Sequence, residues 1–339
     1  MNKSKKMSIG VVGLHGQAAR IVEVIQKISD IEAIVIYYPG GKETSDSRVT
    51  SSFSELENCS AVIIASPTST HAEYLGKLRN FSGYILCEKP MVITPEEAKA
   101  IEFWPSEKIK RLQVNYNFLH SPVAQTLTGL IKKNELGKPL SLSIHSSHGL
   151  AFKQDYEGSW RARSARYGVV ELVGVHFINF ALMSLGPLKH STIATRNVSG
   201  RGRVSDTAFI DLTMRNDCRV QICVSYAMPY SFGINFFGSN GHYKYDGHTE
   251  VIRSPRDTFD TRGRYCDPPI VQQRRIDHAE SFSLGLENSL KQFLRHVKDN
   301  RPFNSHDLRI ALDTMSPLFE CGDGSDPIIS KASFPSTPN

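Results

Sequence analysis

A glycine-rich segment near the start of the chain has the residue types that bind phosphate. Residues 10–18 read GVVGLHGQA. A dinucleotide-binding turn needs a glycine for the tight turn, a second where the backbone approaches a pyrophosphate, and a glycine or alanine where helix packs on strand. Gly13 and Ala18 fit the first and third roles, whereas His15 takes the second, with Gly16 beside it. Helix amides after this turn would face an anion, so the segment predicts a dinucleotide site or, alternatively, a plain strand–turn–helix corner.

The next apolar run lacks the acid that commonly binds the adenosine ribose. This run, Glu32–Tyr38, ends in Tyr38 and is followed by Lys42. Without a carboxylate a 2′-phosphate is not repelled, and Lys42 would attract it. The pattern slightly favours NADP, or use of both NADP and NAD. Glu43 and Asp46 lie close enough to leave NAD open, and Lys42 has the alternative reading of an exposed loop cation.

The elements that must position these residues alternate between strand and helix. Nearly continuous apolar runs indicate strands of a parallel sheet covered on both faces, at 8–13, 32–38, 61–65, 84–87 and 112–116. Helical apolar spacing follows the first run at 17–27. Thr70, Thr94 and Ser121 are expected helix caps. We therefore expect an α/β domain over residues 1–120, with the doubly wound parallel sheet of a Rossmann fold.

The second half of the chain has a different pattern. Alternating strands and turn residues predict an open antiparallel sheet, with strands at 139–147, 190–196, 207–214, 219–226, 233–237 and 242–245. Helices are expected near 171–184, 281–297 and 305–318. Residues 121–339 are therefore expected to form an α+β domain.

Two motifs lie at the carboxyl ends of expected strands, the edge at which parallel sheets bind ligands. ASPTSTH spans 65–71 and CEKP spans 87–90. With the glycine-rich loop in this order, the chain resembles the Gfo/Idh/MocA family of glucose–fructose oxidoreductases, inositol dehydrogenases and rhizopine-catabolism oxidoreductases. The resemblance runs from about Ser8 to Leu318 and includes further matches at Trp160-Arg161, 174–176 (GVH) and 237–241 (FGSNG).

The resemblance implies a fold, a reaction and an assembly. The fold would be a Rossmann domain joined to an open-sheet domain, residues 121–339, that serves substrate binding and oligomerisation, often in homodimers or homotetramers. The reaction would transfer a hydride between nicotinamide C4 and a secondary alcohol carbon of a sugar, cyclitol or nucleotide sugar. A base must then take the hydroxyl proton.

The resemblance also implies roles for individual residues. Lys89 matches the family's catalytic lysine, whose ammonium would stabilise charge on the reacting oxygen. His176 matches its active-site histidine, an acid or base near neutral pH. Asn117 and Asn179 are candidates for the substrate site. The implied cofactor contacts are Gly13, His15, Gly16, Gln17, Tyr38, Lys42, Ser66, Pro67, Thr68, His71, Glu88 and Lys89.

The sequence departs from the family pattern around the histidine. Leu172 and Asn179 stand where the pattern usually has acids, and Leu119 stands where arginine is common. On a continuous α-helix Glu171 would lie roughly 140° from His176, at about 100° per residue. Glu171 then cannot replace the missing acid unless the helix begins later. Lys89 would then carry more of the proton transfer. The alternative function is a non-catalytic NAD(P)-binding sensor or partner subunit.

The loop 145–166 is the expected substrate-binding segment. It is rich in histidine, aromatic and basic residues. Trp160 can stack on a sugar ring, and the guanidinium groups of Arg161 and Arg163 can bind hydroxyls, a carboxylate or a phosphate. A solvated loop with one packing tryptophan is the alternative reading.

Composition narrows the remaining classes of function. The 339 residues carry a net charge of +6 without a long basic block or nucleic-acid motif, which favours a small anionic substrate over nucleic acid. No apolar run is long enough for a membrane span. The six cysteines show no CxxC spacing and no metal-ligand constellation is evident. We therefore expect a cytoplasmic protein with reduced thiols and no bound metal.

Overall fold

The chain divides into two compact units. The computed structural model describes residues 6–40, 45–164, 167–256, 258–320 and 328–330. Unit 1 runs up to His120 and also includes Gly285–Met315, whereas unit 2 runs from Ser121 to Leu284 and resumes at Ser316. The expected second domain, 121–339, therefore differs from this division over Gly285–Met315.

Unit 1 is built on a six-stranded sheet in which every neighbouring pair of strands is parallel. In spatial order the strands are β3 (Val49–Thr50), β2 (Ile31–Tyr37), β1 (Met7–Val12), β4 (Ala61–Ile64), β5 (Tyr84–Glu88) and β6 (Leu112–Asn115). The order reverses at β1, which pairs with both β2 and β4. This is the doubly wound arrangement expected from the apolar runs, and ligands of such sheets bind beyond the carboxyl ends of the strands at the reversal.

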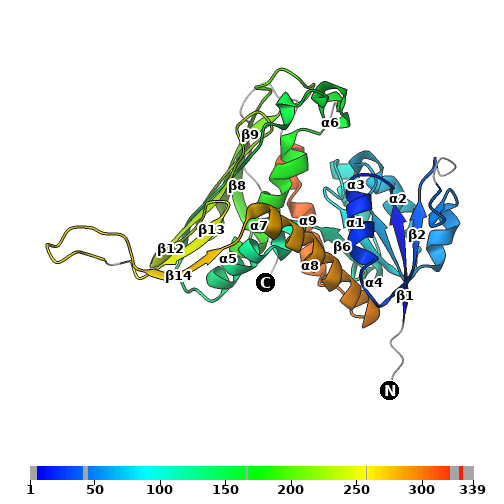
Figure 1. Ribbon diagram of the computed structural model, residues 1–339, viewed down its shortest axis with the longest axis horizontal. Coiled ribbons are helices and arrows are strands. Elements are labelled where there is room, and N and C mark those ends of the chain that lie inside the picture. The colour runs from blue at the N-terminus through cyan, green and yellow to red at the C-terminus, as the bar shows by residue number, and fades with distance from the viewer. Residues whose placement is uncertain (1–5, 41–44, 165–166, 257, 321–327, 331–339) are drawn as a thin grey trace. The chain divides into compact units, whose positions relative to one another are not determined.

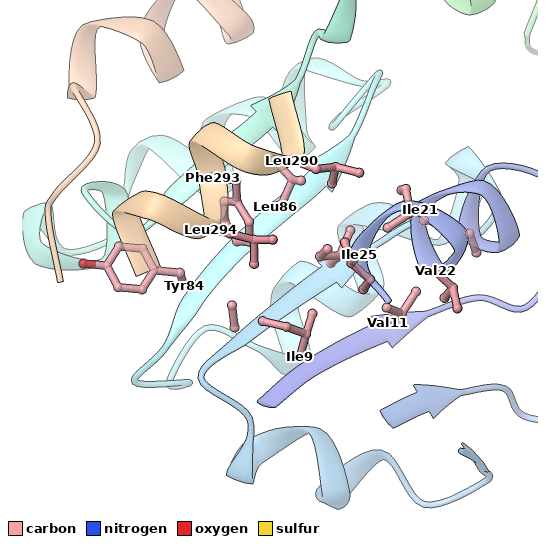
Figure 2. Packing of buried hydrophobic residues seen from close by; sticks show 14 of the residues in the cluster. Ile9, Val11, Ile21, Val22, Ile25, Tyr84, Leu86, Leu290, Phe293 and Leu294 are labelled. Atoms are coloured by element: carbon pink, nitrogen blue, oxygen red, sulfur yellow. The ribbon is translucent and has the colours of Figure 1, made fainter. Parts of the chain in front are cut away.

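Two helices of unit 1 come from a segment late in the chain. The early helices are α1 (Gln17–Ile25), α2 (His71–Lys77), α3 (Pro95–Glu102) and α4 (Ser106–Ile109), and the late ones are most of α8 (His278–Lys298) and α9 (Ser305–Asp313). Figure 2 shows Leu290, Phe293 and Leu294 of α8 against Leu86 of β5, in the same core as Ile21 and Ile25 of α1. This apolar face explains why Gly285–Met315 belongs to unit 1: its buried side chains complete the cover of the sheet.

Unit 2 is built on a nine-stranded, mostly antiparallel sheet (Figure 1). In spatial order its strands are β14 (Ile270–Arg275), β13 (Thr249–Arg253), β12 (Gly241–Tyr245), β11 (Ser231–Gly238), β7 (Pro139–Ser147), β10 (Arg219–Ser225), β9 (Thr207–Met214), β8 (Leu188–Arg196) and β15 (Ile328–Ser330). One pair, β7 and β10, is parallel. Its helices are α5 (Pro122–Lys132), α6 (Trp160–Arg163), α7 (Val175–Leu185) and α10 (Ser316–Glu320); α5 and α7 lie on the same side of the sheet.

The three expected helix caps can be compared with the structure. Thr94 Oγ1 accepts a hydrogen bond from Glu97 N, and Ser121 Oγ accepts one from Ala124 N, so both expected caps are confirmed. Thr70 lies at the start of α2 but makes no side-chain cap. Its hydroxyl donates to Pro67 O. The segment Val170–Gly174 is a π-helical turn, so a spacing argument based on a continuous α-helix does not hold there.

Candidate active site

The glycine-rich loop after β1 is tightly packed on one side and open on the other. Gly13 has φ 120°, and a Cβ there would lie 2.9 Å from Ala65 O and 3.2 Å from the Ala18 methyl group. Gly16 has φ 60°, and a Cβ there would meet no atom within 4 Å. Gly16 is the N-cap of α1 and supplies no side-chain cap. The turn thus packs as a dinucleotide loop does. The start of α1 has no side-chain cap, although Ala18 N donates to His15 O at 3.2 Å.

His15 and Tyr38 lie together at the end of this loop. Their ring centroids are 5.6 Å apart in an edge-to-face arrangement. The histidine that replaces a glycine in the expected fingerprint therefore packs on the residue that ends the neighbouring strand region. Lys42, the expected 2′-phosphate contact, lies outside the described residues.

The loop after β4 is closed by its own hydroxyl groups. Thr70 donates to Pro67 O at 2.8 Å, so the contact of 2.7 Å between Ser66 Oγ and Thr70 Oγ1 has Ser66 as its donor. Thr68 is half-buried in this turn and Pro67 is exposed. His71, an expected cofactor contact, is not exposed to a ligand. Its side chain is buried, and both ring nitrogens lie against backbone carbonyl oxygens.

The carboxylate of Glu88, at the end of β5, is held by a buried hydrogen-bond network. Glu88 Oε1 accepts from Asn115 Nδ2 at 2.6 Å and from Gln17 Nε2 at 3.2 Å. Ser289 Oγ of α8 donates to Asn115 Oδ1 at 2.6 Å. Burial raises the pKa of Glu88, while Lys89 and these donors oppose the rise. The network connects α1, the ends of β5 and β6, and α8. It thereby fixes Glu88, the residue that precedes Lys89.

Asn115 and Ser289 were missed by the sequence reasoning. Asn115 is the last residue of an apolar strand, and Ser289 lies 174 positions later on one face of a helix. Neither belongs to a motif, and only the docking of α8 on unit 1 brings them together. A serine on the largely apolar, buried face of the helix was the one available signal.

Lys89 and Asn117 complete the strand-end edge of unit 1. Lys89 is half-buried, and its peptide bond to Pro90 is cis. Asn117 is buried, and its Nδ2 has no hydrogen-bond acceptor among the described residues. A buried amide donor without an acceptor is costly unless a ligand or water satisfies it. This atom is therefore a candidate for contact with a ligand or a water at the end of β6.

In unit 2, His176 and Asn179 lie buried on α7. Neither Leu172 nor Asn179 supplies a carboxylate at the positions usual for the family pattern. Glu171 Oε2 accepts a hydrogen bond of 2.8 Å from Gly168 N, so this carboxylate closes the start of the helical segment. Burial raises its pKa.

The expected substrate loop gathers cations around a buried phenol. The Arg161 guanidinium lies 4.5 Å from the Trp160 ring centroid, and 52% of Trp160 is exposed. The His148 ring lies 5.1 Å from that of Tyr226. Burial, then Arg161 and Lys153, lower the pKa of His148. Burial raises the pKa of Tyr226 to about 12, and the nearby Arg161 guanidinium opposes this rise. Arg163 is exposed.

Family comparison covers most of both units. Residues 7–116 match the oxidoreductase family with an NAD-binding Rossmann fold, and residues 124–244 match the GFO/IDH/MocA C-terminal domain. The chain belongs to the Gfo/Idh/MocA family of oxidoreductases. The fold class and the family resemblance expected from the sequence are confirmed.

Several relatives of this Gfo/Idh/MocA protein have known names or structures. It is 26% identical over 258 residues to glucose-6-phosphate 3-dehydrogenase of Bacillus subtilis, covering 70% of this chain and 73% of the relative. An Agrobacterium radiobacter oxidoreductase in complex with NAD+, L-tartaric acid and magnesium has a TM-score of 0.76 at 17% identity, covering 93% and 95% of the two chains. A 3-ketoreductase of Actinomadura kijaniata in complex with NADP and TDP-benzene has a TM-score of 0.72 at 18% identity, covering 92% and 95%.

A nicotinamide dinucleotide fits the edge of unit 1 in this Gfo/Idh/MocA chain. The uncapped amides of α1 suit a pyrophosphate. The Nδ2 group of Asn117 suits a polar ligand atom at the other end of the edge. Across the described residues, no group of three or more His, Cys, Asp or Glu is placed to hold a metal ion. No described helix has both the length and the apolar character to cross a membrane.

Proposed function

We propose that this oxidoreductase transfers a hydride between C4 of NAD or NADP and a secondary alcohol carbon of a sugar, cyclitol or nucleotide sugar. The observation that carries the proposal is the fixed Glu88–Lys89–Pro90 turn at the ligand-binding edge of the parallel sheet. The dinucleotide, when bound, supplies the hydride acceptor or donor.

The chain's own residues hold the reactants and move the proton. The Gln17 and Asn115 side chains hold the Glu88 carboxylate, and this fixes the backbone from which Lys89 projects. In the proposed role, Lys89 Nζ stabilises charge on the substrate oxygen and exchanges its proton. His176 is the proposed second acid or base, without a carboxylate from Leu172 or Asn179 to support it.

The proposed substrate is a sugar with an anionic group. In the loop that the sequence indicated for substrate binding, Arg161 and His148 lie near Tyr226, and the charge of Lys153 acts on His148. Trp160 beside Arg161 offers an exposed ring face for stacking on a sugar. The name of the glucose-6-phosphate dehydrogenase relative supports an anionic sugar. Asn117, Arg163 and Asn179 are the further proposed substrate contacts.

A second candidate function is a non-catalytic NAD(P)-binding sensor. It is favoured by the replacement of both acids near His176 and by the engagement of Glu171 with Gly168. A sensor would bind the dinucleotide through unit 1 and would turn over none of these substrates.

The test is a nicotinamide fluorescence titration with NADH and NADPH, followed by turnover assays on sugars, sugar phosphates, cyclitols and nucleotide sugars. Binding with turnover on at least one alcohol supports the dehydrogenase. Binding without turnover on the whole panel supports the sensor, and no binding of either dinucleotide overturns both.

The relative affinities for NADH and NADPH test the expected slight preference for NADP. Light scattering tests our further proposal of a homodimer or homotetramer, and cell fractionation tests the proposed cytoplasmic location.

A further inference from the structure

His71 is a buried histidine that joins the loop after β4 to the turn after β5, both at the edge of unit 1 proposed to bind the cofactor. It begins α2, and only 1% of it is exposed. Its Nδ1 lies 2.7 Å from Pro90 O and its Nε2 lies 3.0 Å from Ser66 O. One partner follows Lys89 at the end of β5, and the other lies in the loop after β4. The ring therefore spans the space between the two loops.

The two partners of His71 impose a condition on its protons. Both are carbonyl oxygens, which accept hydrogen bonds and donate none. A neutral imidazole has one N–H group and can satisfy one of them, so its other nitrogen places a lone pair against an oxygen. The imidazolium has two N–H groups and satisfies both. The observed pair of short contacts is therefore best satisfied by the doubly protonated ring.

We infer that His71 is a positioning residue that holds the Lys89–Pro90 turn to the Ser66 loop, and that its protonation is coupled to binding of the anionic dinucleotide. The inference rests on the proposed function, since the two loops flank the proposed cofactor site. The contact with Pro90 helps to position Lys89, and the contact with Ser66 helps to position the loop after β4.

The surroundings of His71 set the direction of this coupling. Burial lowers the pKa of His71, the two carbonyl oxygens oppose this, and the positive charge of Lys89 adds to the lowering. Lys89 is the charged group that faces the ring from the neighbouring turn. A bound pyrophosphate adds negative charge nearby and favours the imidazolium. By linkage, a dinucleotide that raises the pKa of His71 must itself bind more tightly as the pH falls.

Two matched variants separate the two contacts. The amide nitrogen of His71→Asn occupies the place of Nδ1 and keeps a donor to Pro90 O, whereas that of His71→Gln occupies the place of Nε2 and keeps a donor to Ser66 O. Neither side chain titrates. NADPH affinity and kcat are measured from pH 5.5 to 8.5, with His306→Asn, a change at an exposed histidine on α9, as the control.

The expected results differ between the variants. Wild-type protein and His306→Asn bind NADPH about three- to tenfold more tightly at pH 5.5 than at pH 8.5, as one added hydrogen bond allows. Both His71 variants lose this pH-linked gain. His71→Asn retains more of kcat, and His71→Gln retains more of the NADPH affinity. Equal pH profiles and equal kcat in all four proteins would overturn the inference.

A measurement on wild-type protein keeps the test sharp if the variants fold poorly. In protein labelled with ¹⁵N-histidine, the titration midpoint of the His71 ring is followed by NMR with and without NADPH. The expected result is a higher midpoint with NADPH and two protonated ring nitrogens in the acid form. An unchanged midpoint with NADPH bound refutes the coupling alone. Failure of wild-type protein to bind either dinucleotide refutes the proposed function instead.

Discussion

At the scale of single residues, the proposed chemistry depends most on Lys89. Its position follows from a carboxylate fixed by Gln17 and Asn115, so the side chain begins from a rigid backbone. Replacing Lys89 with methionine keeps an unbranched side chain that is one atom shorter and removes the proton and the charge. We expect Lys89→Met to lower kcat by about 10²–10⁴-fold, the usual contribution of a proton-transfer group, with little change in dinucleotide affinity.

The measurement is steady-state turnover together with fluorescence titration of NADPH. Lys99→Met is the matched control, because Lys99 is exposed on α3 and touches none of the site residues described above. An undiminished kcat in Lys89→Met would remove Lys89 from the proposed mechanism. A loss of kcat in the control as well would point to a general effect on folding.

Some residues of the site lie in short sequence motifs, whereas others come together only when distant parts of the chain fold. Gly13, Glu88 and Lys89 lie in short motifs whose spacing can be interpreted along the chain. The partners of Glu88 could not be predicted so well, because Asn115 and Ser289 meet only after α8 packs on the sheet. His71 was predicted as a cofactor contact from its motif, but its two carbonyl partners depend on the conformation of two separate loops.

At the scale of elements, α8 is fastened to β6 by one buried polar contact within an apolar interface. The hydroxyl of Ser289 donates to Asn115, which in turn donates to Glu88. Ser289→Ala leaves the Asn115 oxygen buried without this donor, at a cost of about 1–3 kcal/mol. We expect a lower urea midpoint and, since Asn115 is then less fixed, a weaker dinucleotide affinity.

Ser283→Ala is the control for this prediction, since Ser283 is an exposed serine on the same helix. Urea denaturation followed by circular dichroism gives the stability, and NADPH titration gives the affinity. If Ser289→Ala matches the control in both measurements, the network does not position Glu88.

Most strands were predictable where their side-chain pattern was clear, although β13 alternates and was not predicted. The buried strands of unit 1 are continuous apolar runs, and the structure confirms them. β14 is exposed at each of its residues and lacks an inward apolar face, so no alternation indicated it. The π-helical turn Val170–Gly174 was also beyond prediction, because sequence spacing does not distinguish it from an α-helical turn.

At the scale of the whole molecule, chain order does not determine which unit a helix joins. The apolar face of α8 was predictable from its periodicity, but the sheet that it covers was not. Leu290, Phe293 and Leu294 pack in the core of unit 1 although they follow the strands of unit 2. A division of this chain at residue 120 alone would separate unit 1 from part of its own core.

Stability of the whole molecule should depend on pH through two partly buried histidines. Burial lowers the pKa of His120 and of His278 to about 4, against about 6.5 in an unfolded chain. Below pH 6.5 the unfolded chain binds protons that the folded chain does not, so the free energy of unfolding falls as the pH drops toward 4. Buried Glu88 and Glu171 act in the opposite direction, because burial raises their pKa values.

We expect the urea midpoint to fall between pH 7.5 and pH 5.0, with His120 contributing a loss of at most about 2 kcal/mol. In His120→Gln the side chain cannot titrate, so the difference between the two pH values should shrink even if the variant is less stable at both. His306→Asn serves as the exposed control here too. A wild-type midpoint that rises on acidification, or a His120→Gln difference as large as that of the wild type, would show that burial of this histidine does not set the acid sensitivity of the fold.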